Sequence, residues 1–252
     1  INILGLSLGM ATALSIAFYV SFELSFDDFQ PRVNNIYRVV LERTAEGQTQ
    51  EITSLPAPVA DELLKVSDVE NVLRFVYIGY QNNSIIRTDD GERKTLQVDD
   101  IYYADSTIAE MLHFPIKSGS TSNFASPHKL MLANSEAEKL FGSQDPVGES
   151  LMLSNNVGRQ EYEVVAVFED LPQNTDFDYK VLLSMSTLPY ADNDDALTSY
   201  DYWQSQTYAL LGSSASTSYV IDHLDGIFES NDEIAWSTSF MPLRELHFQP
   251  YA

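Results

Sequence analysis

The first 22 residues form an unbroken run of apolar and small polar side chains with no charged residue. As a helix rising about 1.5 Å per residue this run would be about 33 Å long, which matches the roughly 30 Å hydrocarbon core of a bilayer. Tyr19, Phe22 and Phe26 lie near its end, where aromatic rings favour the membrane–water boundary. The pattern therefore predicts a transmembrane helix over residues 1–22. The alternative is a cleaved signal peptide, because Ala11-Thr12-Ala13 resembles a cleavage site, but the apolar run continues past it.

Beyond residue 33 the apolar positions follow the periods of strands and amphipathic helices. Alternation predicts strands over residues 36–43, 72–80, 161–168 and 207–211. A further hairpin is predicted between residues 85–88 and 94–98, with its turn at Asp89-Asp90-Gly91. Helical segments are marked by a cap at Thr53 or Ser54, a capping box at Ser135 with Gly142 ending its helix, and a stripe of Val220, Leu224 and Ile227. The order of these elements predicts an α+β fold of two packed lobes.

The sequence contains no second apolar run of comparable length. The stretches 72–80 and 162–168 are short and are interrupted by Arg74 and Glu163. Acidic residues follow the first run, and Arg32 is the first cation. Since Lys and Arg favour the cytoplasmic side of a membrane, we expect one span followed by an extracytoplasmic domain.

Charge and composition exclude several classes of function. The chain has 37 acidic and 14 basic residues and a formal net charge of −23, which disfavours binding to nucleic acid or to an anionic lipid surface. The absence of cysteine excludes a disulfide framework, a thiolate metal site and a cysteine nucleophile. A saline habitat and a cationic substrate are two possible reasons for the acidic charge, and the charge alone does not distinguish between them.

Searches for catalytic and metal-binding patterns are negative. The chain has no phosphate-binding loop of the NTPase type, and its four histidines are too far apart for a helical zinc motif. The acidic clusters at 89–90, 99–100 and 192–195 lack the ligand spacing of a calcium loop. We therefore expect no catalytic residue, no cofactor and no metal.

One apparent motif lies inside the apolar run. Gly5-Leu6-Ser7-Leu8-Gly9 matches the GxSxG elbow of esterases, but that elbow needs a strand–turn–helix on a soluble sheet. Gly5, Gly9 and Ala13 instead repeat every four residues, as in faces through which membrane helices approach one another closely. These three residues are a candidate helix-packing face, and ordinary membrane-helix composition is the alternative.

The order of landmarks carries a family resemblance. The chain opens with GLSLGMATALSIAFYVSFELSFDDFQPRVNNIYRVV and continues with TSLPAPVADELLK, DVENVLRF, YYADSTIAEMLHFPIKSG, LMLANSEAEKLFGSQDPVGESLML, YEVVAVFEDLPQNTDFDYKVLLSM and PLRELHF. In this order the segments resemble FtsX-like ABC transporter permeases of the type with a MacB-like periplasmic core domain. Two positions depart from the family pattern, because Gln30 and Asp176 stand where histidine is usual.

The resemblance implies a non-catalytic permease subunit in the bacterial inner membrane, with its soluble domain in the periplasm. Such permeases form homodimers or heterodimers beside a cytoplasmic ABC ATPase, in contact with membrane lipid. Some also act with a periplasmic adaptor or a cell-wall hydrolase. Exported peptides or drugs and extracted lipoproteins are the substrates of the family. On this reading the chain is a fragment, since the further membrane helices of such permeases would follow it and Ile1 is not a natural start.

The resemblance also implies a division into a porter-like lobe, residues 34–80 and 176–252, and an inserted lobe, residues 81–175. Residues 23–33 would form the membrane-exit segment, which we expect to continue the helix and carry its motion into the first strand. The alternative is that these residues only anchor the helix. The candidate coupling residues are Glu23, Leu24, Ser25, Phe26, Asp27, Phe29, Ile36 and Tyr37.

Two other classes of protein stay open on the sequence. A single-span extracytoplasmic sensor or binding module would have the same apolar run and acidic domain. A secreted enzyme would use the run as a signal peptide and depend on paired carboxylates such as Glu169 and Asp170. Adjacent residues on a strand point to opposite faces, which argues against a shared active site for that pair.

Overall fold

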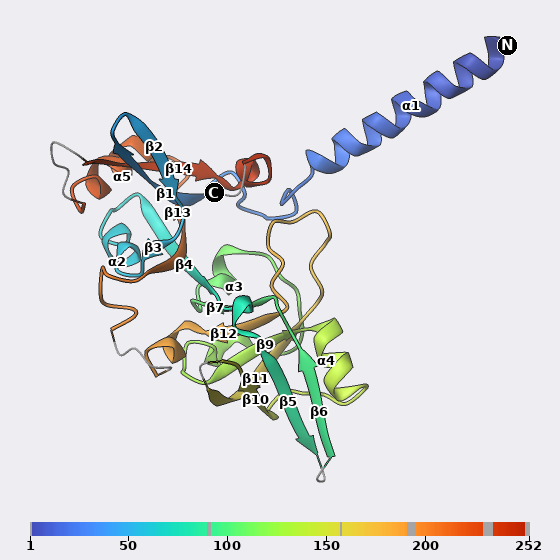
Figure 1. Cartoon of the computed structure of the whole chain (residues 1–252), viewed down its shortest axis with the longest axis vertical. Coiled ribbons are helices and arrows are strands. Elements are labelled where there is room, and N and C mark those ends of the chain that lie inside the picture. Colours follow the sequence, from blue (N-terminus) through green and yellow to red (C-terminus); the bar gives the residue numbers. More distant parts are fainter. Residues whose placement is uncertain (1, 90–91, 157, 191–194, 229–233, 250–252) are drawn as a thin grey trace.

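The N-terminal helix projects as a separate rod from the body of the molecule (Figure 1). The computed structural model describes all residues except 1, 90–91, 157, 191–194, 229–233 and 250–252. Helix α1 spans Asn2–Glu23. Its segment Ile3–Glu23 is long and apolar enough to cross a membrane, with a mean hydropathy of 1.9 and no part buried in the chain. The predicted N-terminal apolar helix is confirmed.

A single mixed sheet runs through the rest of the molecule. Its main path has the order β14-β1-β13-β4-β7-β12-β9-β11-β10-β5-β6, and β2, β3 and β8 pair with β1, β13 and β11. Most pairs are antiparallel, while β9 with β11 and β7 with β12 are parallel. The strands are β1 (Ile36–Ala45), β2 (Gln48–Ile52), β3 (Leu55–Pro56), β4 (Val69–Tyr77), β5 (Ser84–Asp89), β6 (Glu92–Gln97), β7 (Ile101–Ala104), β8 (Ile116–Gly119), β9 (Lys129–Ala133), β10 (Ser150–Ser154), β11 (Arg159–Phe168), β12 (Val181–Ser184), β13 (Trp203–Leu211) and β14 (Ile234–Pro242).

Short helices cover the sheet at both ends. The α-helices are α2 (Val59–Leu63), α3 (Ile108–Met111), α4 (Asn134–Phe141) and α5 (Thr217–Leu224). Turns of 3₁₀ helix are η1 (Gly79–Gln81), η2 (Thr121–Asn123), η3 (Met185–Tyr190) and η4 (Leu243–Phe248). The predicted α+β class is therefore confirmed, with strands supplying most of the regular structure.

Three hydrophobic clusters form the core. At one end α2 and α5 pack on β1, β4 and β13, and at the other α4 packs against β9 and β11. Between them lies an aromatic cluster in which the rings of Phe75 and Tyr179 stack with centroids 5.8 Å apart. The hydrogen-bonded sheet is continuous from one end to the other. The lobe boundaries at 80/81 and 175/176 stay a prediction.

Two helix starts differ from the sequence-based prediction. No helix begins at Thr53 or Ser54; residues 55–56 form β3 and α2 begins at Val59. Pro56 and Pro58 explain this, because a residue that precedes proline is driven towards extended backbone.

The predicted capping box at Ser135 is also wrong, because α4 begins one residue earlier, at Asn134. The Ser135 hydroxyl and N–H instead donate to the Asp170 carboxylate, at 2.6 and 3.1 Å. An acidic residue from a distant segment thus satisfies the start of this helix. At the other end, Gly142 has a φ of 64° and ends the helix as predicted. The turn predicted at 89–91 falls largely outside the described residues.

Candidate functional site

Helix α1 stops where the polar part of the chain begins. Its last residue is Glu23, and residues 24–35 form turns, so the predicted continuous helix into the first strand is wrong. Asp27 has a φ of 56°, in the left-handed region. Aspartate and asparagine enter this region more readily than most side chains, so Asp27 suits a chain that turns after α1 and does not continue as a helix to Ile36.

His247 links the end of α1 to the body of the domain. It lies on η4, with Nε2 2.7 Å from Glu23 Oε2 and Nδ1 3.1 Å from Asp176 Oδ1. The Phe26 ring stacks on the imidazole with centroids 3.4 Å apart and an angle of 15° between the planes. Phe22, in the last turns of α1, meets Phe26 edge to face at 5.5 Å. Three segments far apart in the sequence therefore meet at one histidine.

Asp27 ties the same exit turn to residues 174–176. Its carboxylate accepts hydrogen bonds from the Thr175 hydroxyl and, at 3.2 Å, from the Asp176 N–H. Its own N–H donates to the Asn174 carbonyl at 3.0 Å. The Asn174 amide in turn donates to the Ser25 carbonyl at 2.9 Å and to the Ser25 hydroxyl at 3.0 Å. We refer to Glu23, Phe26, Asp27, Asp176 and His247, with these partners, as the exit junction.

The surroundings of the exit junction favour the protonated forms of its aspartate and histidine side chains. Asp27 is fully buried, and this burial raises its pKa to about 6, although hydrogen bonds from Thr175 and Asp176 partly oppose the change. Burial likewise raises the pKa of Asp176, against the influence of His247. For His247, burial lowers the pKa, but the hydrogen bonds and charges of Glu23 and Asp176 outweigh it and the pKa is raised. The two carboxylates that contact His247, those of Glu23 and Asp176, thus favour its imidazolium form.

The structure brings together only part of the predicted set of coupling residues. Glu23, Ser25, Phe26 and Asp27 all take part in the contacts of the exit junction. Leu24 is exposed and Phe29 is half-buried.

Ile36 and Tyr37 belong to β1 instead. Ile36 is fully buried in the central core, and the Tyr37 ring packs on Phe240 at 5.9 Å. His247, Thr175 and Asn174 were not predicted as site residues, because nothing in the local pattern relates them to residue 23. Asp176 stood out in the sequence only as a departure from a family pattern.

The candidate packing residues on α1 face open space. Among the residues that the structure describes, a side-chain carbon added at Gly5 or Gly9 would meet nothing within 4 Å, and Ala13 is exposed. Among the described residues, no group of three His, Asp or Glu side chains is arranged to hold a metal ion.

Comparison with known proteins gives a consistent result. The family model of the MacB-like periplasmic core domain matches residues 1–227. A domain of a protein described as a permease, from Porphyromonas gingivalis, has a TM-score of 0.68 at 16% identity, covering 84% of this chain and 91% of that one. The periplasmic region of MacB from Actinobacillus actinomycetemcomitans has a TM-score of 0.53 at 14% identity, covering 80% and 87%. The extracellular domain of the ABC-type transporter YknZ from Gram-positive bacteria has a TM-score of 0.50 at 13% identity, covering 81% and 100%. No curated protein sequence matches the chain.

Proposed function

The chain belongs to the family of MacB-like periplasmic core domains of ABC transporter permeases, and from this premise we propose that its exit junction transmits ATP-driven movement of α1 to the extracytoplasmic domain. The observation that carries the proposal is His247, which contacts Glu23 at the end of α1 and Asp176 in the domain. A contact can transmit movement from one segment to another only if the residues on both sides of the contact are held rigidly. Stacking of Phe26 and the buried hydrogen bonds of Asp27 supply that rigidity.

In the proposed function the chain itself carries out no bond chemistry. Permeases of this family work with a cytoplasmic ABC ATPase, and we propose that this ATPase supplies the energy. We place the chain in the bacterial inner membrane with its domain in the periplasm, where it would act as a homodimer or heterodimer. The proposed movement would serve export of a peptide or drug or extraction of a lipoprotein, so the substrate is left open.

The first test removes the link at His247. We expect His247→Ala to broaden the distance distribution between spin labels at Ala17→Cys on α1 and Asp222→Cys on α5, because the helix end loses its bond to the domain. The chain has no native cysteine, so both labels are unique. With the ATPase present, the coupling between ATP binding and the domain movement should weaken by about 1–3 kcal/mol, a change of about 5- to 150-fold in the equilibrium between the two domain positions. Double electron–electron resonance spectroscopy on the protein in lipid nanodiscs measures the distances between the two labels.

His223→Ala is the matched control. His223 is exposed on α5, away from the exit junction, so its loss should leave the distance distribution unchanged. An unchanged distribution in His247→Ala would contradict the proposed coupling role of this histidine.

A second prediction concerns the proposed packing face of α1. We expect Gly9→Leu to weaken association with a neighbouring membrane helix, because a large side chain prevents close approach of the two backbones. The unfolding temperature of the domain should not change, since position 9 meets open space within the chain. Cross-linking in membranes measures the association. Ala11→Leu, about 200° around the helix from position 9, is the control; equal loss with both variants would argue against a specific face.

A further inference from the structure

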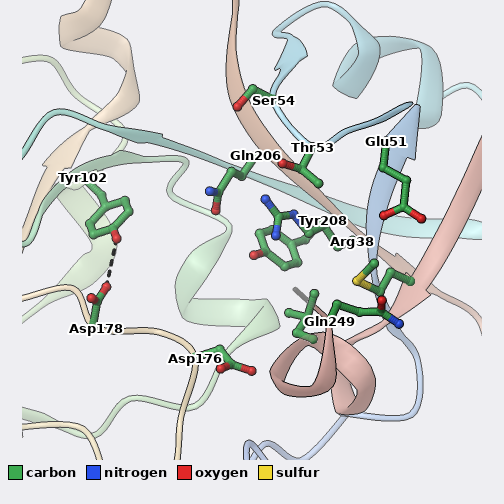
Figure 2. Close-up of a pocket in the computed structure, with 12 residues that line it drawn as sticks. Arg38, Glu51, Thr53, Ser54, Tyr102, Asp176, Asp178, Gln206, Tyr208 and Gln249 are labelled. Atoms are coloured by element: carbon green, nitrogen blue, oxygen red, sulfur yellow. Dashed lines mark hydrogen bonds between the residues drawn. The ribbon is translucent and has the colours of Figure 1, made fainter. Parts of the chain in front are cut away.

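A cavity of about 370 Å³ lies in the domain next to the exit junction, with which it shares Asp176. Its lining comes from β1, β2, β7, β13, β14 and η4, from residues 53–54 and 249, and from Asp176 and Asp178, which precede β12. Figure 2 shows the polar side chains of Arg38, Gln206 and Asp176 around this space. Cavities of about 300 Å³ and above are the size that binds small molecules in proteins.

Among the described residues, two buried side-chain atoms of residues that line this cavity have no hydrogen-bond partner. They are Nε of Arg38, on β1, and Oδ2 of Asp176. Within the described part of the chain, Arg38 makes no ion pair, although the carboxylates of Glu51 and Asp178 also line the cavity. The other oxygen of Asp176 is held by His247. Leaving a buried charged group without a partner costs free energy, so both side chains would gain from a ligand that approaches their remaining polar atoms from the cavity.

The two atoms have opposite charges, and this restricts the chemistry of the ligand. Arg38 calls for an acceptor such as a carboxylate, which a guanidinium binds through two parallel hydrogen bonds. Asp176, together with Asp178 and Glu51, calls for a cationic donor. The lining carries one positive and three negative groups, so it repels a purely anionic ligand, and a ligand that also pairs with Arg38 needs a carboxylate beside its cationic group. The aromatic faces of Tyr102 and Tyr208 complete the lining and suit an ammonium group or a short apolar side chain.

We propose that this cavity binds a small zwitterion, a free amino acid or dipeptide, with its carboxylate on Arg38 and its ammonium group on Asp176. The inference goes beyond the proposed function and does not depend on it. Because Asp176 also contacts His247, an occupant of the cavity touches a residue of the exit junction. A ligand site placed there is suited to report the presence of the ligand to the end of α1.

Isothermal titration calorimetry on the protein in lipid nanodiscs tests the proposal with three probes. The probes are L-alanyl-L-alanine, its N-acetyl derivative and its C-terminal amide. We expect the free dipeptide to bind, and each blocked form to bind about 10- to 100-fold more weakly, the effect of losing one charged hydrogen bond. Arg38→Gln should bind the free dipeptide as weakly as the wild type binds the amide.

Arg43→Gln is the matched control, because Arg43 lies on the same strand but does not line the cavity. It should leave the affinity for the dipeptide unchanged. The proposal is overturned by equal affinity for the dipeptide and its amide, by no binding of the dipeptide up to about 10 mM, or by equal losses in the two arginine variants. If Arg38→Gln does not fold, the comparison of the three probes on the wild-type protein still decides.

Discussion

Inserting two glycines between Leu24 and Phe26 should abolish ATP-driven movement of the extracytoplasmic domain while the domain stays folded. The insertion separates Glu23 from Phe26 and Asp27, so α1 and the exit turn can no longer both reach His247 and residues 174–176. Glycine also has the most backbone freedom of any residue, which turns a rigid connection into a flexible one. The folded domain does not depend on this linker, because its three core clusters lie outside residues 24–26.

The movement can be followed by energy transfer between a label at Asp222→Cys and an acceptor on the lipid headgroups, with the ATPase present and ATP added. ATP hydrolysis should continue in the variant. The control carries the same two glycines between Glu46 and Gly47, at the exposed turn from β1 to β2, where both residues already have positive φ. Retention of the full ATP-dependent change after insertion at residue 25 would rule out the exit segment as a mechanical link.

The second large effect is a pH-dependent gain in stability for Asp27→Asn. The pKa of Asp27 is about 6 in the folded domain, above its ordinary value of 3.8, so loss of the proton is less favourable in the folded chain. The resulting penalty on folding is fully present above about pH 6 and disappears as the pH falls below 3.8. Asparagine cannot ionise and also tolerates the left-handed backbone. Its free energy of unfolding relative to wild type should therefore rise by about 2–3 kcal/mol between about pH 4 and pH 8.

Urea unfolding at a series of pH values measures this difference. The comparison cancels the contribution of the many other carboxylates, which titrate in both proteins. Asp28→Asn serves as control, because Asp28 is exposed and its ion pair with Arg244, at 3.0 Å, lies in water. A difference between Asp27→Asn and wild type that does not vary with pH would mean that the buried carboxyl does not titrate as described.

The sequence predicted well the features that depend on local pattern. The apolar helix, the strand that begins at Ile36 and the helix end at Gly142 each follow from residues close in the chain. Errors arose where a distant or neighbouring group decided the conformation. Ser135 binds Asp170 from another segment, and Pro56 and Pro58 delay the start of α2.

The exit junction was predicted only on its N-terminal side for the same reason. Glu23, Phe26 and Asp27 stand out because they follow the span, whereas His247 becomes relevant only when the fold brings it to Glu23. No periodicity relates two residues on η4 and α1. Similarly, the opposite charges of Arg38 and Asp176 at one cavity depend on the packing of β1 beside residues 176–178.

Two segments of the domain hold the end of α1 and the exit turn that follows it, and this has a geometric consequence. His247 lies just after β14, an edge strand of the sheet, whereas residues 174–176 precede β12 in its middle. A single tether would act as a swivel and let the domain keep its orientation while the helix tilts. Here a segment that follows β14 and a segment that precedes β12 meet at one junction, so a tilt of α1 would pull on both parts of the sheet together. The far end of the domain, at β5 and β6, should then sweep through the largest arc.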